Sequence, residues 1–428
     1  MRVLVLGGGG REHALVWRLR HDPDVKTVMA APGNPGMASL GECLPVDLAD
    51  PTAMLALAER RDADLTVVGP EGPLDQGVVD IFRRAGRPIV GPARAGSALE
   101  CSKAFAKAFM TRAGVPTARA IICRDVERAL QVVSGAEFGF PVVVKADGLA
   151  AGKGVVVADD RRAAETAVRA AMEAHQFGAA GDTLVIEECL TGPEVSFFVL
   201  ADGVHAVVLG SAEDHKRLLD DDRGPNTGGM GAVAASSLVT PALEHEVLTT
   251  IVRPVLDEMQ ADGEPYRGFL YVSLMITGAG PKVIEFNVRM GDPEAQVVMP
   301  LLEGAFAQAL LASAVGRLTG MRLGLSAVRA VGVTLAAAGY PGPVATGTPV
   351  EGLDAAAARP NTLVFHAGTR LADARVVTAG GRVLTVVGQG PTFDDARQVA
   401  YDAVSAIRFE GMQFRRDIGR RAKDRIPA

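Results

Sequence analysis

The sequence predicts a multidomain protein that combines the α/β and α+β classes. Strands alternate with helices in the first part of the chain, and glycine-rich loops follow several strands. At roughly 150 residues per domain, the 428 residues correspond to about three domains. Hydrophobic residues make up 48% and charged residues 22%, a balance that is typical of globular proteins and excludes a disordered chain.

The first region is expected to form a parallel sheet with helices between its strands. The apolar run Met1–Leu6 is followed by Gly7–Gly10 and by a helical pattern that lasts to Asp22. Loops that follow parallel strands gather at one edge of the sheet, so a ligand site is expected there. Further strands are expected at 25–30, 65–68 and 88–90, helices at 51–61 and 77–85, and a loop at 69–73.

The pattern changes from Ser102 onward. The apolar strand Phe140–Lys145 carries one lysine and precedes the glycine-rich loop Asp147–Gly154. Glu194–Leu200 and Val204–Leu209 are expected to pair as a hairpin. The other expected strands are 155–158, 184–188, 269–276, 282–286, 329–338, 362–366 and 383–388, and the other expected helices are 103–113, 161–174, 242–262 and 393–407.

Composition excludes several classes of protein. The net charge of -6 argues against a general nucleic-acid binder, which usually carries a basic surplus. The cysteines form no C-x-x-C pair, which disfavours a metal knuckle or a dense disulfide framework. The apolar start is too short for a signal peptide, and polar residues interrupt every long apolar stretch. We therefore expect a cytoplasmic protein that does not span a membrane.

The loop Gly7–Gly10 with Arg11 is a candidate anion site. A strand–glycine–helix turn directs free backbone N–H groups at an anion, and a guanidinium adds a bidentate phosphate contact. A dinucleotide fingerprint is incomplete because Glu12 or His13 stands at its third glycine position. A phosphorylated small molecule is therefore favoured over a dinucleotide, with a ligand-free tight turn as the alternative.

The loop from Lys145 to Gly154 resembles a phosphate-binding loop without being a Walker A motif. It joins two strands, and Gly154 follows Lys153 where a Walker motif has Ser or Thr. A glycine flap that closes over a triphosphate fits this pattern, because burying Lys145 without an anion would be costly. The alternative is a surface hairpin whose lysine extends into solvent.

Two carboxylate-bearing strands are candidate parts of the site. Glu187 and Glu188 end one strand and face opposite ways, so at most one enters a given pocket, and a solvated strand end is the alternative. Glu285 and Asn287 share one face of another strand. Carboxylate and amide oxygens suit Mg²⁺ that is held jointly with phosphates, whereas the alternative is an exposed polar face. Arg289 continues that face.

The polar segment Asp214–Gly231 mixes charge with glycine. Its main-chain donors suit a carboxylate or a phosphate, and the alternative is a mobile acidic surface loop around Asp220–Asp222. The basic segment Arg415–Arg425 is interpreted as a solvated helix end.

These motifs, in this order, resemble the phosphoribosylamine–glycine ligases (glycinamide ribonucleotide synthetases) of the ATP-grasp superfamily. The resemblance rests on Gly7–Ala14, Lys145–Gly154, Asp214–Gly231 and Ile284–Gln296, and it extends to Phe365–Thr369 and Arg416–Gly419. It implies an N-terminal Rossmann-like domain over 1–102, an ATP-grasp domain over 103–323 with a lid over about 122–193, and a mixed α/β domain over 324–428.

The resemblance also implies an activity. ATP would phosphorylate glycine, and 5-phosphoribosylamine would attack the glycyl phosphate, with Mg²⁺ or Mn²⁺ as cofactor. Partners would be these small molecules, with neither nucleic acid nor membrane, and the chain would be a monomer, with a dimer as the alternative. Another ATP-grasp carboxylate–amine ligase or carboxylase, and a nucleotide-binding regulator without turnover, remain alternative functions.

The resemblance assigns roles to residues of this sequence. Lys145, Arg289 and Asp292 would be catalytic, and Glu285 and Asn287 would bind the metal, because the strand Tyr271–Met275 has no second acid. ATP would contact Lys103, Lys145, Gly152, Lys153, Gly154, Glu187, Glu188, Leu190 and Glu194. Glycine and phosphoribosylamine would contact Gly10, Arg11, Glu12, Asn34, Asp214, Lys216, Asn226, Thr227, Met230, Arg289, Gly291 and Asp292.

Overall fold

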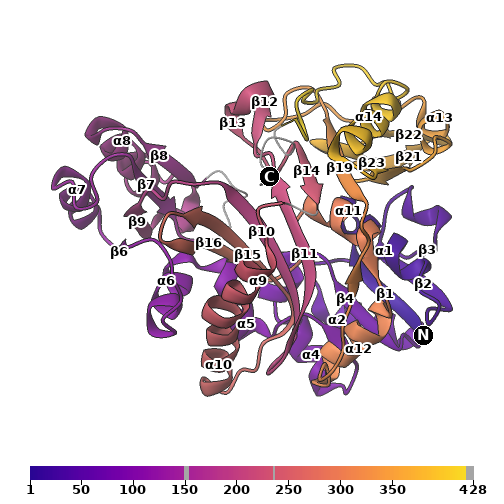
Figure 1. Cartoon of the computed structure of the whole chain (residues 1–428), viewed down its shortest axis with the longest axis horizontal. Coiled ribbons are helices and arrows are strands. Elements are labelled where there is room, and N and C mark those ends of the chain that lie inside the picture. Colours follow the sequence, from indigo (N-terminus) through magenta and orange to yellow (C-terminus); the bar gives the residue numbers. More distant parts are fainter. Residues whose placement is uncertain (149–153, 235–236, 421–428) are drawn as a thin grey trace.

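The first region folds into a five-stranded parallel sheet of order β3-β2-β1-β4-β5 (Figure 1). The computed structural model describes residues 1–148, 154–234 and 237–420. The strands are β1 (Arg2–Gly7), β2 (Thr27–Pro32), β3 (Glu42–Cys43), β4 (Leu65–Val68) and β5 (Ile89–Val90). The helices are α1 (Gly10–Arg20), α2 (Pro51–Arg60), α3 (Glu71–Asp75), α4 (Val78–Arg84) and α5 (Arg94–Cys101), with a 3₁₀ turn at η1 (Met37–Ser39).

The parallel sheet is confirmed, and one loop assignment is wrong. The segment 69–73 is predicted as a loop, but α3 begins inside it at Glu71. Pro70 precedes the helix in an extended conformation, and Pro73 stands in its first turn, where no intrahelical donor is needed. This short helix brings Glu71 to the edge where the strands end.

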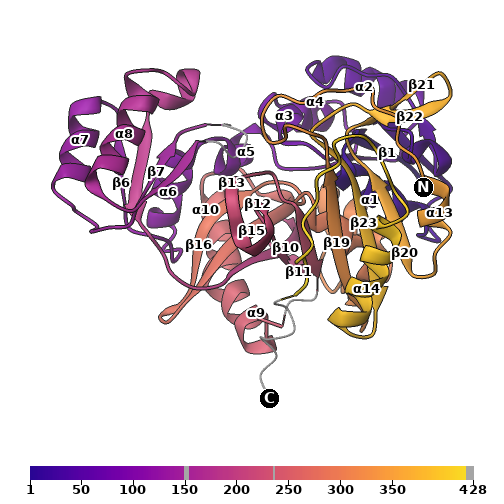
Figure 2. The same cartoon turned by 90° about the horizontal axis from the view of Figure 1, so that it is seen from above.

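A small antiparallel sheet of order β6-β9-β7-β8 forms a separate lobe, called the lid below. Helix α6 (Lys103–Arg112) leads into the lid. Figures 1 and 2 show the lid standing apart from the other elements. The lid has its own apolar core, which includes Cys123, Val144, Val168 and Ile186. It consists of β6 (Ala120–Cys123), α7 (Val126–Ser134), β7 (Val142–Ala146), β8 (Val155–Ala158), α8 (Arg161–Met172), η2 (Gly178–Gly181) and β9 (Leu184–Glu188).

The rest of the chain is organised around an eight-stranded antiparallel sheet of order β16-β15-β10-β11-β14-β19-β23-β20. The expected hairpin is confirmed, because β10 (Glu194–Asp202) pairs with β11 (Ala206–Asp214). The same sheet continues through the C-terminal region, since β14 (Gly231–Ala234) pairs with β19 (Arg329–Ala336). The other strands are β15 (Arg267–Thr277), β16 (Gly280–Asn287), β20 (Thr362–His366) and β23 (Arg382–Gly390).

Helices and small hairpins cover this sheet. The predicted helix 242–262 is present as α9 (Pro241–Val247), the π turn η4 (Leu248–Val252) and α10 (Arg253–Ala261). The other helices are α11 (Glu294–Val298), α12 (Phe306–Val315), α13 (Leu353–Ala357) and α14 (Phe393–Val404), with 3₁₀ turns at η3 (Asp220–Asp222) and η5 (Met299–Leu301). Paired short strands are β12 (Arg217–Leu219) with β13 (Arg223–Asn226), β17 (Leu302–Glu303) with β18 (Gly324–Leu325), and β21 (Thr369–Ala372) with β22 (Arg375–Thr378).

The interpretation of the basic segment as a solvated helix end is wrong at Arg415. Arg415 is not part of a solvated helix end, because its side chain is only 1% exposed and pairs with Asp222 and Asp417. Residues 421–425 of that basic segment lie outside the described residues.

Within the described chain, none of the helices is both long and apolar enough to cross a bilayer.

Candidate active site

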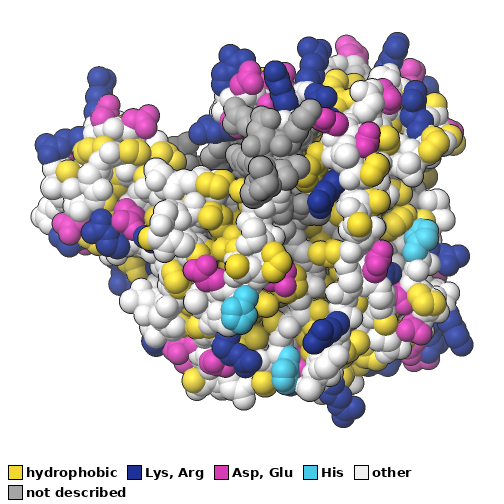
Figure 3. Space-filling view, viewed as in Figure 1, with side chains coloured by type: hydrophobic (Ala, Val, Ile, Leu, Met, Phe, Trp, Pro, Cys, Tyr) yellow, Lys and Arg dark blue, Asp and Glu magenta, His cyan; other side chains and the backbone are white. Residues whose placement is uncertain are grey.

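The predicted site residues come from the lid, the edge strand β16, the segment 214–230 and the glycine loop before α1. Strand β16 forms one edge of the eight-stranded sheet. Next to it, the segment after α6 makes an isolated bridge between Thr117 and Val283. Figure 3 shows the lid as a protruding lobe with a concave notch between it and the rest of the molecule. We therefore expect the site where the lid meets the larger sheet.

Lys145 of β7 is buried, so the alternative of a solvent-exposed lysine is wrong. It is 5% exposed and forms an ion pair with Glu187 of β9. The second oxygen of Glu187 lies 2.5 Å from Nζ of Lys107 on α6, so two buried ammonium groups share one carboxylate. Lys145 Nζ also donates to the carbonyl of Ile284 at 3.4 Å, which links the lid to β16.

Glu188 faces away from this pair, as the strand alternation predicts. It accepts hydrogen bonds from Arg119 Nε at 2.9 Å and from Lys282 Nζ at 3.2 Å. Burial opposes ionisation, but these hydrogen bonds outweigh it and lower the pKa of Glu188 to about 2. Leu190, just after β9, is half-buried, and Glu194 at the start of β10 is exposed. Their contacts with adenine and ribose remain predictions.

Four cations act electrostatically on the carboxylate of Glu285 on β16. Burial alone would raise its pKa, but Lys216, Lys145, Lys103 and Arg289 together hold the pKa below its usual value. These cations come from separate segments: the loop before β12, β7, α6 and the residues after β16. Such a concentration of positive charge around one ionised carboxylate is suited to a polyanion with a bound metal ion.

Glu285 and Asn287 provide the oxygen atoms expected for a divalent cation. Asn287 is 9% exposed, and its Oδ1 accepts one hydrogen bond, from Arg289 Nη2 at 3.2 Å. On the neighbouring strand, Ser273 stands opposite Glu285. No cluster of three or more His, Cys, Asp or Glu residues suited to a metal occurs among the described residues. A carboxylate and an amide oxygen fit an ion whose remaining ligands are phosphates and water.

Arg289 is held by two acidic residues that the sequence analysis missed. Its Nε lies 3.1 Å from Glu71 of α3, and its Nη2 lies 2.7 Å from Glu100 of α5. Burial works against ionisation of Arg289, but Glu100 and Glu71 raise the pKa of its guanidinium above the usual value. Glu71 lies in the segment 69–73, which the sequence analysis predicted as a loop, whereas nothing in the sequence around Glu100 indicates its role.

The segment 214–230 is organised around Lys216. Its Nζ donates to Glu194 at 2.8 Å, and its carbonyl accepts from the backbone N–H of Thr227 at 2.8 Å. Asp214 has a buried Oδ1 without a hydrogen-bond partner among the described residues, and burial followed by repulsion from Glu294 raises its pKa. Two further predicted site residues are Asn226, which is exposed, and Met230, which is fully buried.

In the glycine loop, Glu12 and Asn34 hold the backbone. Glu12 accepts from the N–H of Gly9 at 2.7 Å and lies 2.5 Å from Arg11 Nε. Asn34 donates to the carbonyls of Gly8 and His366 and accepts from two backbone N–H groups. A Cβ on Gly10 would overlap Nε2 of Gln296, so a larger residue at the start of α1 would displace the end of that side chain. Phosphate binding by this loop remains a prediction.

Asp292 connects α11 to the C-terminal region. It accepts a hydrogen bond from Gln296 at 2.7 Å and lies 3.4 Å from the guanidinium of Arg382, which also donates to the carbonyl of Gly228. Burial opposes ionisation of Asp292, but Arg382 leads the groups that lower its pKa. Sequence analysis missed Arg382, which lies far along the chain. Gly291 is adjacent, and a Cβ there would overlap Glu294.

Part of the flap falls outside the described residues, including the predicted ATP contacts Gly152 and Lys153. Gly154 is buried, and its carbonyl accepts from the N–H of Ala146 at 2.8 Å. Lys103 Nζ donates to the carbonyl of Gly148 at 3.0 Å, which places this lysine beside the described start of the flap.

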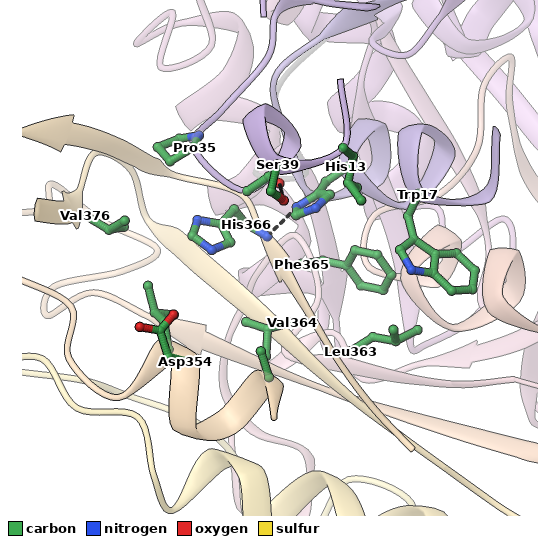
Figure 4. Close-up of a pocket in the computed structure, with 14 residues that line it drawn as sticks. His13, Trp17, Pro35, Ser39, Asp354, Leu363, Val364, Phe365, His366 and Val376 are labelled. Atoms are coloured by element: carbon green, nitrogen blue, oxygen red, sulfur yellow. Dashed lines mark hydrogen bonds between the residues drawn. The ribbon is translucent and has the colours of Figure 1, made fainter. Parts of the chain in front are cut away.

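A separate cavity of about 370 Å³ lies between α1 and β20 (Figure 4). Its wall includes His13, Trp17 and Phe365, and none of the predicted site residues contributes to it. Nδ1 of His13 accepts a hydrogen bond from the backbone N–H of His366 at 2.8 Å. The cavity therefore lies at a junction between the N-terminal and C-terminal regions, outside the predicted site.

Comparison with known proteins gives one consistent result. Sequence models of the N domain, the ATP-grasp (A) domain and the C domain of phosphoribosylglycinamide synthetase match residues 1–100, 101–295 and 330–421. The chain belongs to the phosphoribosylglycinamide synthetase family. Phosphoribosylamine–glycine ligases from Ralstonia nicotianae and Streptomyces coelicolor are 47% and 48% identical, over 99% of this chain and 99% of each relative.

Solved structures agree with this family assignment. The crystal structure of phosphoribosylamine–glycine ligase from Thermotoga maritima has a TM-score of 0.85 and 32% identity, and the likeness covers 97% of this chain and all of that one. The biotin carboxylase domain of 2-oxoglutarate carboxylase from Hydrogenobacter thermophilus has a TM-score of 0.71 at 19% identity, and the likeness covers 96% of this chain and 91% of that one. At this identity the likeness shows a shared fold and nothing more. The predicted fold class is thus confirmed.

Proposed function

We propose that this chain joins glycine to 5-phosphoribosylamine at the expense of ATP, an early step of purine biosynthesis. The observation that carries the proposal is the ionised Glu285 among Lys103, Lys145, Lys216 and Arg289, at the junction of lid and sheet. Transfer of a phosphoryl group depends on positioning and on charge neutralisation, and it needs no protein nucleophile. The names of the full-length relatives supply the substrates.

The proposed reaction has two steps, phosphoryl transfer to glycine and attack by the amine. A carboxylate oxygen of glycine attacks the γ-phosphorus of ATP, and the bond to the β-phosphate oxygen breaks, giving glycyl phosphate and ADP. The amine nitrogen of phosphoribosylamine then attacks the carbonyl carbon. Phosphate leaves with its bonding electrons, the nitrogen loses a proton, and N1-(5-phospho-D-ribosyl)glycinamide results.

The residues of the chain have distinct tasks in this proposal. Lys103 and Lys145 bind the triphosphate, and Arg289 stabilises the acyl phosphate with its planar guanidinium. Because Glu187 is engaged by Lys145 and Lys107, the end of β9 offers mainly backbone groups to adenine. Lys216 and Asp292 orient glycine and phosphoribosylamine, while the glycine loop at Gly10 and Arg11 receives the sugar phosphate.

Glu285 and Asn287 would hold a divalent cation, with Mg²⁺ preferred and Mn²⁺ as the alternative. Mg²⁺ is typically bound by one or two protein oxygens together with phosphate oxygens. When bound, such an ion neutralises charge on the phosphates of ATP. We further propose that the chain acts in the cytoplasm as a monomer, with domain boundaries near 102 and 323.

Glu285→Ala is expected to abolish glycine-dependent ADP release while some nucleotide affinity remains, since the lysines still contact the phosphates. ADP release is measured with glycine plus phosphoribosylamine, and nucleotide binding by titration calorimetry. Glu59→Ala, at an exposed position on α2, is the control and should behave as the unmodified protein.

A second arm of the assay replaces both substrates by bicarbonate and a carboxylation acceptor. Turnover only with bicarbonate would assign the chain to the carboxylases and would refute the proposal. Full activity in Glu285→Ala would remove the metal role from that residue.

A further inference from the structure

The C-terminal segment 415–418 binds the tip of the hairpin formed by β12, η3 and β13. The guanidinium of Arg415 bonds both oxygens of Asp417, at 2.8 and 2.7 Å. Its remaining nitrogen donates to Asp222 at 2.8 Å and to the carbonyl of Arg217 at 3.2 Å. One buried arginine thus joins its own segment to the hairpin at two places.

Backbone hydrogen bonds reinforce this connection. The N–H of Asp221 donates to Asp417 at 2.9 Å, and the N–H of Arg416 donates to Asp220 at 2.7 Å. Helix α14 anchors the segment from the other side, because Tyr401 donates to the carbonyl of Arg415 at 2.8 Å. The hairpin tip is therefore held to α14 by way of residues 415–418, and Figures 1 and 2 show β12 and β13 beside the C-terminal region.

The hairpin tip has an uncommon backbone conformation. Asp221 and Asp222 have φ angles of 60° and 54°, in the left-handed region that non-glycine residues seldom adopt. Three consecutive aspartates also repel one another. The guanidinium of Arg415, the backbone N–H of Arg416 and the carboxylate of Asp417 hold the three aspartates in place.

The base of the same hairpin carries predicted substrate contacts. Lys216 immediately precedes β12, Thr227 immediately follows β13, and two hydrogen bonds join them at the carbonyl of Lys216. Arg217 and Asn226 pair directly above that base. Because the tip is only a few residues from the base, a change at Asp222 is transmitted along two short strands to Lys216 and Thr227.

We propose that Arg415 is a positioning residue, which holds the β12–β13 hairpin so that Lys216 and Thr227 face glycine and phosphoribosylamine correctly. This inference rests on the proposed function. The fork-like guanidinium is required, because a lysine cannot bond Asp417 through two parallel contacts and reach Asp222 as well.

The test compares Arg415→Lys and Asp222→Asn with Arg375→Lys, an exposed arginine of the same region. We expect the KM for glycine or for phosphoribosylamine to rise about tenfold in the first two variants, since small displacements of positioning groups have large kinetic effects. The KM for ATP should change less than about threefold, and the double variant should lose less than the sum of the two, because both residues act through one contact. The control should match the unmodified protein.

Hydrogen exchange provides a readout that does not depend on turnover. In the protein without substrates, amides of residues 217–226 should exchange about tenfold faster in Arg415→Lys and Asp222→Asn, whereas β10 and β11 should keep their protection. Unchanged exchange in the hairpin would overturn the inference. Wild-type KM values for both substrates, accompanied only by a lower Tm, would also overturn it by reducing the contact to a structural one.

The outcomes separate this inference from the proposed function. If Arg415→Lys fails to fold, Asp222→Asn decides the question alone, because Asp222 is partly exposed. Absence of glycine-dependent ADP release in the unmodified protein would refute the proposed function. The exchange data would still show whether Arg415 holds the hairpin.

Discussion

Adjacent carboxylates on β9 have very different surroundings. The side chain of Glu187 is 3% exposed and shared by two buried lysines, whereas the side chain of Glu188 pairs with Arg119, whose side chain is 68% exposed. A buried charge that loses its partner is costly, but an exposed pair contributes little. The alternation of a strand predicts that these two residues point in opposite directions, but the sequence does not reveal which of them is buried.

Glu187→Gln is therefore expected to lower the free energy of unfolding by about 3 kcal/mol, since two ammonium groups remain buried beside a neutral amide. Glu188→Gln, the matched control, should cost less than Glu187→Gln, because Arg119 and Lys282 keep more contact with water than the two buried lysines do. Urea unfolding followed by circular dichroism measures both. Similar losses in the two variants would contradict this account of the Lys145–Glu187–Lys107 cluster.

Among the elements, glycines on strands allow helices to pack closely. Gly388 of β23 lies against α14, and a Cβ there would overlap backbone atoms of Ala396 and Ala400. Strand β23 and helix α14 were both expected from apolar patterns in the sequence. Their close approach was not, because a lone glycine in a strand indicates a bulge as readily as a packing contact.

Gly388→Ala should lower the free energy of unfolding by at least about 2 kcal/mol, because the backbone of α14 cannot move aside as a side chain can. Gly278→Ala is the control: this exposed turn glycine has no atom within 4 Å of the position of a Cβ. Thermal unfolding of the two variants gives the comparison. Equal Tm values would show that α14 shifts freely on the sheet.

Across the whole molecule, local patterns were predicted better than long-range contacts. The parallel sheet and the pairing of Glu285 with Asn287 on one strand face follow from periodicity over a few residues. The continuous sheet through β14 and β19 does not, because β14 has only four residues and its partner lies about a hundred positions further along the chain. Glu71, Glu100 and Arg382 were missed for the same reason, as each reaches the site from a separate element.

The junction of α1 and β20 is one such long-range contact. His13 is 4% and His366 is 8% exposed. Burial, with a smaller effect of His366, lowers the pKa of His13 to about 3, and burial lowers the pKa of His366 to about 4. Below about pH 6.5, the ordinary histidine pKa, the unfolded chain binds a proton at each of these residues. The folded chain binds it only near the lowered pKa, so acid favours unfolding.

Acidification should therefore weaken this junction. Stability from His13 is fully present above pH 6.5 and is lost as the pH falls toward the folded pKa of about 3, by up to about 1.4 kcal/mol per pH unit. His13→Asn keeps an acceptor for the N–H of His366 but cannot titrate, so its urea midpoint should fall less between pH 7 and pH 5 than that of the unmodified protein. Acidic and basic groups elsewhere cancel in this comparison. His245→Asn, at an exposed position on α9, is the control, and its urea midpoint should change with pH as that of the unmodified protein does. The same pH dependence in His13→Asn would contradict the account, because it would show that His13 becomes protonated inside the folded molecule.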